Sequence, residues 1–130
     1  MIYRKFLHVI LILSILLTVS GCKQNSSNVP WVEVNINLDE AKTLQSEVDN
    51  GHRVGEMDPV QVAHEFLNEK LNIREDINEH KEIKAGEGEK GYRLTPSSDG
   101  RMVEVILFQP VRTDSTGIWV VKKYRFIEGK

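Results

Sequence analysis

The chain has 130 residues, 40% hydrophobic and 28% charged, with 17 basic and 19 acidic side chains and a formal net charge of −2 at pH 7. This length suits one small domain with a core of its own. Such a balance of charge argues against a nucleic-acid partner, which would need a basic face, and against electrostatic binding of lipid headgroups by a polybasic segment.

The N-terminal segment has the three zones of a bacterial export signal. Two basic residues are followed by residues 6–19, which are apolar apart from one histidine, one serine and one threonine. This stretch is short for a membrane span. Residues 19–22 read Val-Ser-Gly-Cys and resemble the lipobox of a bacterial lipoprotein at every position. The resemblance implies a signal peptide at 1–21, cleaved before Cys22. The alternatives are an uncleaved transmembrane anchor and ordinary signal cleavage with an incidental cysteine.

Lipidation of Cys22 would place the protein on the extracytoplasmic face of the cell membrane. The lipobox resemblance implies acyl chains such as palmitate on this residue, and two chains hold a protein stably where one is marginal. Residues 22–30 are polar and are expected to form a flexible tether before a single domain at 31–130. Because Cys22 is the only cysteine, its lipidation would leave no thiol for a disulfide, for catalysis or for a metal.

Two helices are predicted after an N-terminal strand. Residues 31–38 alternate between apolar and polar side chains, which predicts a half-buried strand. Apolar residues at helical spacing predict a short helix over 39–48 that ends at the turn-forming sequence Asp-Asn-Gly. The clearer helix begins at Asp58, a suitable N-cap, has Pro59 in its first turn and runs to about residue 71.

The second half of the chain is predicted to form an antiparallel meander. The candidate strands are 81–85, 92–95, 102–108 and 118–127. The nearly continuous apolar run at 102–108 predicts a central strand covered on both faces, and Asp99-Gly100 predicts a hairpin turn. Residues 73–81 are highly charged and are expected to form either a helical turn or a surface connection. The sum is an α+β domain with one main helix on a curved antiparallel sheet of about four to five strands. The pattern also looks like cystatin-like or nuclear transport factor-like cones.

Two sequence segments carry a family resemblance. Residues 48–52 (Val-Asp-Asn-Gly-His) lead to 58–63 (Asp-Pro-Val-Gln-Val-Ala), and 108–111 (Phe-Gln-Pro-Val) lead to 117–121 (Gly-Ile-Trp-Val-Val). Together they resemble a group of small, uncharacterised exported or lipid-anchored proteins of Gram-positive, often spore-forming bacteria. That group usually has a tryptophan before the Asp-Pro pair, whereas residues 53–57 here contain no aromatic side chain. The resemblance implies a cellular location and a fold, but no particular reaction.

Several polar residues are candidates for a site. Asp49, His52 and Asp58 surround a turn and could supply donors for a metal or for acid–base catalysis. Local roles in the turn, the loop and the helix cap are favoured, although neither turn nor cap needs the imidazole of His52. His64 and His80 belong to no metal-binding signature, and a solvated helix face is expected for them.

Trp119 is either a core residue or a binding platform. The alternation of the last strand places it on one face with Lys123 and Arg125. If the ring is exposed there, this face would suit a peptide, a glycan or an anionic ligand. Alternatively, the basic residues at 122–125 form a solvent-exposed end of the strand that binds no ligand.

The leading hypothesis is a lipid-anchored, non-catalytic interaction or adaptor domain of the cell envelope. It follows from the predicted anchor at Cys22 and from the lack of an activated nucleophile or metal motif in the sequence. The partners would be the membrane and an envelope protein. One alternative is a small-ligand or peptide binding module with a cavity between helix and sheet. A second is a minor envelope enzyme that uses His52. Candidate binding residues are His52, Trp119, Lys123 and Arg125; no catalytic residue, cofactor or metal is assigned, and the oligomeric state is left open.

Overall fold

The computed structural model describes residues 29–97 and 101–128. The predicted signal, Cys22 and the hairpin turn at Asp99-Gly100 lie outside these ranges. The elements in chain order are β1 (Val32–Glu33), α2 (Leu38–Asp49), the 3-10 helix η2 (Val54–Met57), α3 (Pro59–Glu69), β2 (Ile77–Ile83), β3 (Glu89–Pro96), β4 (Arg101–Phe108) and β5 (Val120–Glu128). Within the described ranges, no helix combines the length and the hydropathy needed to cross a membrane.

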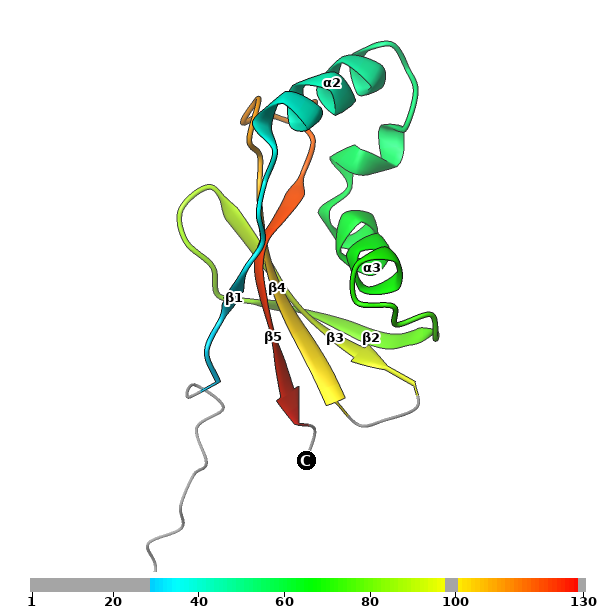
Figure 1. The fold of residues 1–130 in the computed structure, drawn as a ribbon, viewed down its shortest axis with the longest axis vertical. Helices are drawn as coiled ribbons and strands as arrows, with labels where there is room; N and C mark the ends of the chain where they lie inside the picture. Colours follow the sequence, from blue (N-terminus) through cyan, green and yellow to red (C-terminus); the bar gives the residue numbers. More distant parts are fainter. Residues whose placement is uncertain (1–28, 98–100, 129–130) are drawn as a thin grey trace, which may run out of the picture.

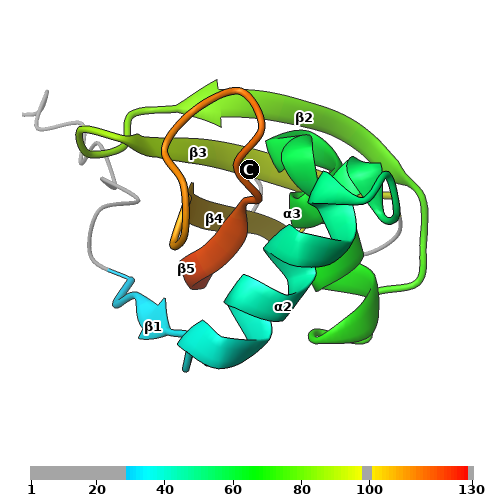
Figure 2. The ribbon, with the colours of Figure 1, turned by 90° about the horizontal axis from the view of Figure 1, so that it is seen from above.

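The five strands form one open antiparallel sheet in the order β1-β5-β4-β3-β2. Helix α3 lies against the middle of this sheet, whereas α2 lies beyond its end, next to the loop that leads into β5 (Figure 1). Seen from above, both helices are on the same side of the sheet (Figure 2). The predicted α+β class is therefore confirmed, and both predicted helices are present as α2 and α3.

The N-terminal strand is much shorter than predicted. Strand β1 contains only Val32 and Glu33, and Leu38 already belongs to α2. The side chain of Asn37 explains the difference, because its Oδ1 atom accepts the backbone N–H of Asp39 at 3.0 Å and so caps the helix. The alternating apolar and polar residues at 34–36 therefore belong to an extended segment that leads from β1 to the helix cap.

Helix α3 begins as predicted and supplies one side of the main core. Oδ1 of Asp58 accepts the backbone N–H of Val60 at 2.9 Å, and Pro59 occupies the first turn. The helix ends at Glu69, about two residues earlier than expected. The buried residues of the main core are Val62, Ala63, Leu67, Tyr92, Leu94, Val103, Val105, Leu107 and Val121. Each large apolar side chain buried here contributes about 1.5–3 kcal/mol.

The charged segment after α3 forms an edge strand. Ile77–Ile83 pairs with β3 in antiparallel register, so the predicted helical turn or surface connection at 73–81 is wrong over most of its length. The side chains between the two isoleucines are exposed. An edge strand contributes few side chains to the core, so it shows little apolar alternation, and its charges discourage pairing with other chains.

Strand β4 is buried on both faces, as predicted, but its second face combines the apolar Ile106 with a buried carboxylate. Glu104 is only 1% exposed, and its strand neighbours in register are Arg93 on β3 and Arg125 on β5. The Glu104 carboxylate accepts the Nε–H of Arg93 at 2.9 Å and that of Arg125 at 2.7 Å. The Trp31 ring covers the Arg125 guanidinium at 4.4 Å. We call these four residues the Glu104 cluster.

Candidate functional site

The C-terminal half of α2 and the loop between β4 and β5 meet in space. Both carboxylate oxygens of Asp49 accept hydrogen bonds from the Arg112 guanidinium, at 2.9 and 2.8 Å. Gln45, which is 3% exposed, accepts the backbone N–H of Ile118 at 3.0 Å and donates to the Thr116 carbonyl at 2.9 Å. Helix α2 is therefore held against the loop between β4 and β5 by polar contacts over a small apolar cluster.

The loop before β5 has no space for a side chain at Gly117. A Cβ atom there would lie 1.9 Å from the Arg112 carbonyl oxygen. The Gln109 amide donates to the Gly117 carbonyl at 2.9 Å and so ties the two ends of the loop together. The structure thus explains the sequence Gly-Ile-Trp at 117–119. Gly117 allows the tight loop, Ile118 packs in the small apolar cluster under α2, and Trp119 lies beside η2.

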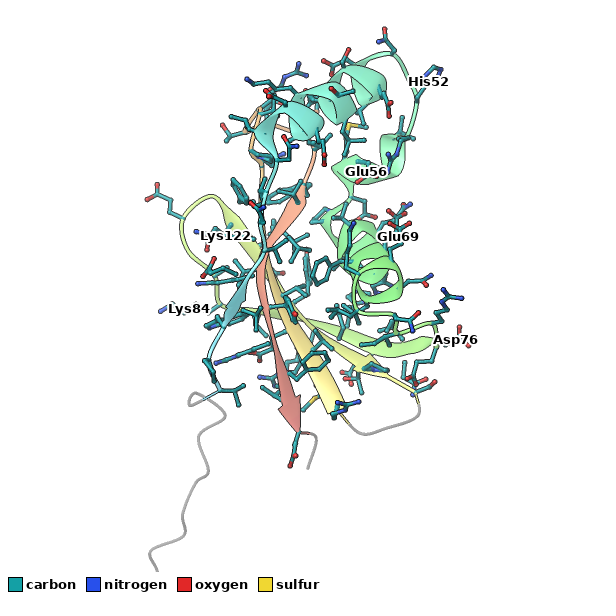
Figure 3. All side chains as sticks on the ribbon, viewed as in Figure 1. His52, Glu56, Glu69, Asp76, Lys84 and Lys122 are labelled. Atoms are coloured by element: carbon teal, nitrogen blue, oxygen red, sulfur yellow. The ribbon has the colours of Figure 1, made fainter. Side chains whose placement is uncertain are left out.

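The three residues around the first turn do not assemble into a site. Asp49 is engaged by Arg112, which holds the pKa of that carboxyl below its ordinary value, and Asp58 caps α3. The local role expected for Asp58 is therefore confirmed, whereas the Asp49 carboxylate pairs with a residue 63 positions away in the chain instead of within its own turn. His52 is exposed, and Figure 3 shows its side chain directed away from the sheet. Across the described ranges, no three His, Cys, Asp or Glu side chains lie close enough together to hold a metal ion.

An open cleft of about 740 Å³ lies between α2, α3 and the start of β5. We call it the α2–α3 cleft. Its apolar lining consists of Val34, Ile36, Ala41, Leu44, Val62, Phe66, Trp119, Val120 and Val121. Phe66 and Trp119 are half-buried, so each ring keeps part of its surface open to solvent. Partly exposed aromatic rings in a concave surface are typical anchoring points for a ligand.

The polar lining of the cleft is mostly acidic. The carboxylates are Asp39, Glu40 and Glu47 from α2, Glu56 from η2, and Glu65 and Glu69 from α3, against the basic side chains of Arg53 and Lys70. The two helices therefore present carboxylates from opposite sides of the apolar lining.

Glu56 is the most unusual of these carboxylates, and the sequence did not single it out. The residue is 8% exposed, and its carboxylate contacts the Arg53 guanidinium at 2.6 Å. Burial raises the pKa of Glu56; Glu65 and Glu69 raise it further, and Arg53 opposes them. Its carbonyl accepts the backbone N–H of Trp119 at 2.9 Å. A buried carboxyl with a raised pKa in a cleft is a common mark of a functional site.

The sequence signal for Glu56 was only the mixed charge of its segment, since residues 53–57 contain an arginine and a glutamate and no aromatic side chain. Residues 54–57 form η2, on which Figure 3 labels Glu56. Both Arg53 and Glu56 line the cleft, so this segment gives the cleft a charged wall.

Trp119 does not share a face with Lys123 and Arg125, so that expectation is wrong. The register of β4 and β5 shifts just after Ile106, where β5 contains an extra residue that breaks its alternation. Trp119 consequently lines the cleft, whereas Lys123 and Arg125 lie on the other face of the sheet. There their cationic groups are 5.3 and 4.4 Å from the Trp31 ring.

His64 and His80 are closer together than a solvated helix face would require. Their ring centroids are 5.9 Å apart, between α3 and β2, and His80 is 6.5 Å from the Tyr92 ring. The Nε2 atom of His64 is buried, and no described residue forms a hydrogen bond with it. Burial lowers the pKa of His64, and the neighbouring His80 lowers it further. His64 is therefore held as a neutral, half-buried side chain.

Comparison of the chain with protein-family models, with curated proteins and with solved structures gave no match. A function can therefore be inferred only from the predicted anchor and from the α2–α3 cleft.

Proposed function

We propose that this chain is an envelope lipoprotein, anchored through Cys22, whose domain binds another molecule in the α2–α3 cleft and catalyses no reaction. The anchor is supported by the lipobox at 19–22. Binding is supported by one observation, a cleft of about 740 Å³ with two half-buried aromatic rings in its lining. Ligand sites in proteins generally have about 300–1,000 Å³ and a mostly apolar lining with a few polar groups.

The lining favours binding over catalysis. Among the described residues that line the cleft there is no histidine, cysteine or serine, and the hydroxyl of Thr43 donates to the Asp39 carbonyl at 3.0 Å. A hydroxyl or thiol nucleophile needs a base beside it for activation, and the described lining offers carboxylates as its only titratable acids or bases of this kind. His52, the residue on which the enzyme hypothesis depends, is not part of the lining.

The anchor is tested by mass spectrometry of the N-terminal peptide from the membrane fraction. The expected peptide begins at Cys22 and carries acyl chains. A peptide that begins at another residue, or an unmodified Cys22, would contradict the anchor.

Binding is tested with the mature chain in detergent. The chain contains two tryptophans, Trp31 and Trp119, so a Trp31→Phe variant makes Trp119 the single fluorescent reporter in the cleft. A screen of peptides and small envelope molecules should yield ligands that shift Trp119 emission. The same ligands should bind His52→Ala with unchanged affinity. A screen that leaves Trp119 emission unchanged throughout would count against the cleft as a binding site.

A further inference from the structure

We infer that the α2–α3 cleft takes an amphipathic basic peptide, in which lysine or arginine side chains flank apolar ones. This inference rests on the proposed function of the cleft and names the chemistry of its partner. It is carried by the arrangement of charged and apolar side chains in the lining.

The charge of the lining is strongly one-sided. Among the described lining residues there are six carboxylates and two cations, and one of these cations, Arg53, is already paired with Glu56 at 2.6 Å. Outside the lining, Lys42 lies 3.8 Å from Asp39. Lys70 is exposed and lies just after the end of α3. An anionic ligand would meet repulsion from both helices, whereas a cationic one would meet carboxylates on both.

The apolar part of the lining indicates which kind of cationic ligand fits the cleft: a metal ion, a polyamine or a peptide. Val62 is 8% exposed and Phe66 and Trp119 are half-buried, so the cleft has an apolar base between its two acidic sides. A metal ion or a polyamine would leave this surface in contact with water. A peptide with apolar side chains between basic ones would cover it and would place its cations opposite the carboxylates.

Glu56 gives such a peptide a specific position to occupy. Its carboxylate contacts the Arg53 guanidinium at 2.6 Å, and Glu65 and Glu69 on α3 are near enough to raise its pKa. An ammonium or guanidinium group of the peptide would act as the second counterion. Binding should therefore tighten as pH rises through the titration of Glu56, and Glu56→Gln should flatten that dependence.

The test measures the affinity of three labelled 12-residue peptides for the mature chain in detergent, by fluorescence polarisation. One alternates leucine with lysine, one leucine with glutamate, and one leucine with serine. We expect the lysine peptide to bind and the glutamate peptide not to bind. A Glu65→Gln/Glu69→Gln variant should bind the lysine peptide roughly tenfold more weakly, because two partly exposed charge pairs are lost.

A matched variant separates the cleft from general charge attraction. Glu79→Gln/Glu87→Gln removes two exposed carboxylates outside the lining and changes the net charge by the same amount. It should leave the affinity unchanged; an equal loss in both double variants would overturn the inference.

The two proposals fail differently. If all three peptides bind equally and shift Trp119 emission, the cleft binds peptides but the basic partner is wrong. If no ligand of any charge shifts Trp119 emission, the binding function itself fails.

Discussion

Glu104→Gln is the substitution for which the structure gives the clearest magnitude. The change keeps the shape of the side chain but removes the charge that holds Arg93 and Arg125. Glu104 has a side-chain exposure of 2%, against 32% for Arg93 and 14% for Arg125. Loss of one partner of a buried ion pair costs about 3–5 kcal/mol. Because Arg93 can turn toward water, we expect the lower end of this range, about 3 kcal/mol. For a domain of this size that is a fall in Tm of about 12–24 °C.

Thermal unfolding at pH 7, followed by circular dichroism, measures this loss. Glu79→Gln on the exposed edge strand is the control and should stay within about 0.5 kcal/mol of the wild type. A second variant, Arg125→Met, separates the charge from the packing on Trp31. Combined with Glu104→Gln it should destabilise less than the sum of the two single changes, since they remove the same contact. A Glu104→Gln protein that melts within about 4 °C of the wild type would refute the reasoning.

Three further substitutions test the core, the helix cap and the half-buried His64 by thermal melting. Phe66→Asp places a charge where the ring packs on Tyr124, with centroids 5.4 Å apart, and should cost about 2–4 kcal/mol; an unchanged melt would contradict the packing. Asp58→Ala removes the α3 N-cap and should cost about 1 kcal/mol, whereas Asp58→Asn should cost far less. The pKa of His64 is lowered from 6.5 in the folded state, so its contribution to stability is present above pH 6.5 and lost as pH falls through the lowered pKa. His64→Gln should flatten the dependence of Tm on pH as pH falls below about 6.5, and an equal slope in both proteins would count against this assignment.

Local patterns predicted the elements that depend on near neighbours in the chain. Asp58 and Pro59 marked the start of α3 because a cap is made with the next few backbone N–H groups. The apolar run at 102–108 marked β4 as the central strand, since a strand buried on both faces needs few polar residues. The same reasoning failed at 34–38, where the alternation continued but the cap at Asn37 had already begun α2.

The candidate site depended on contacts that the sequence does not display. Strand β5 has one extra residue between Val121 and Lys123, and this places Trp119 and Lys123 on opposite faces of the sheet. No local sequence pattern marks that shift of register. The buried Glu56 was overlooked because a glutamate in a short charged segment ordinarily faces solvent. The cleft itself is lined from segments between residue 34 and residue 121, so it exists only after the helices have packed.

The sequence alone determined the fold class and the cap of α3, because each depends on residues close together in the chain; the lipid anchor at Cys22 stays a prediction of the same kind. Tertiary structure alone decided the pairing of Arg93, Glu104 and Arg125, the face on which Trp119 lies and the acidic lining of the cleft. The physical reason is strand register: side chains alternate between the two faces of a sheet, so a shift of one residue moves every following side chain to the other face.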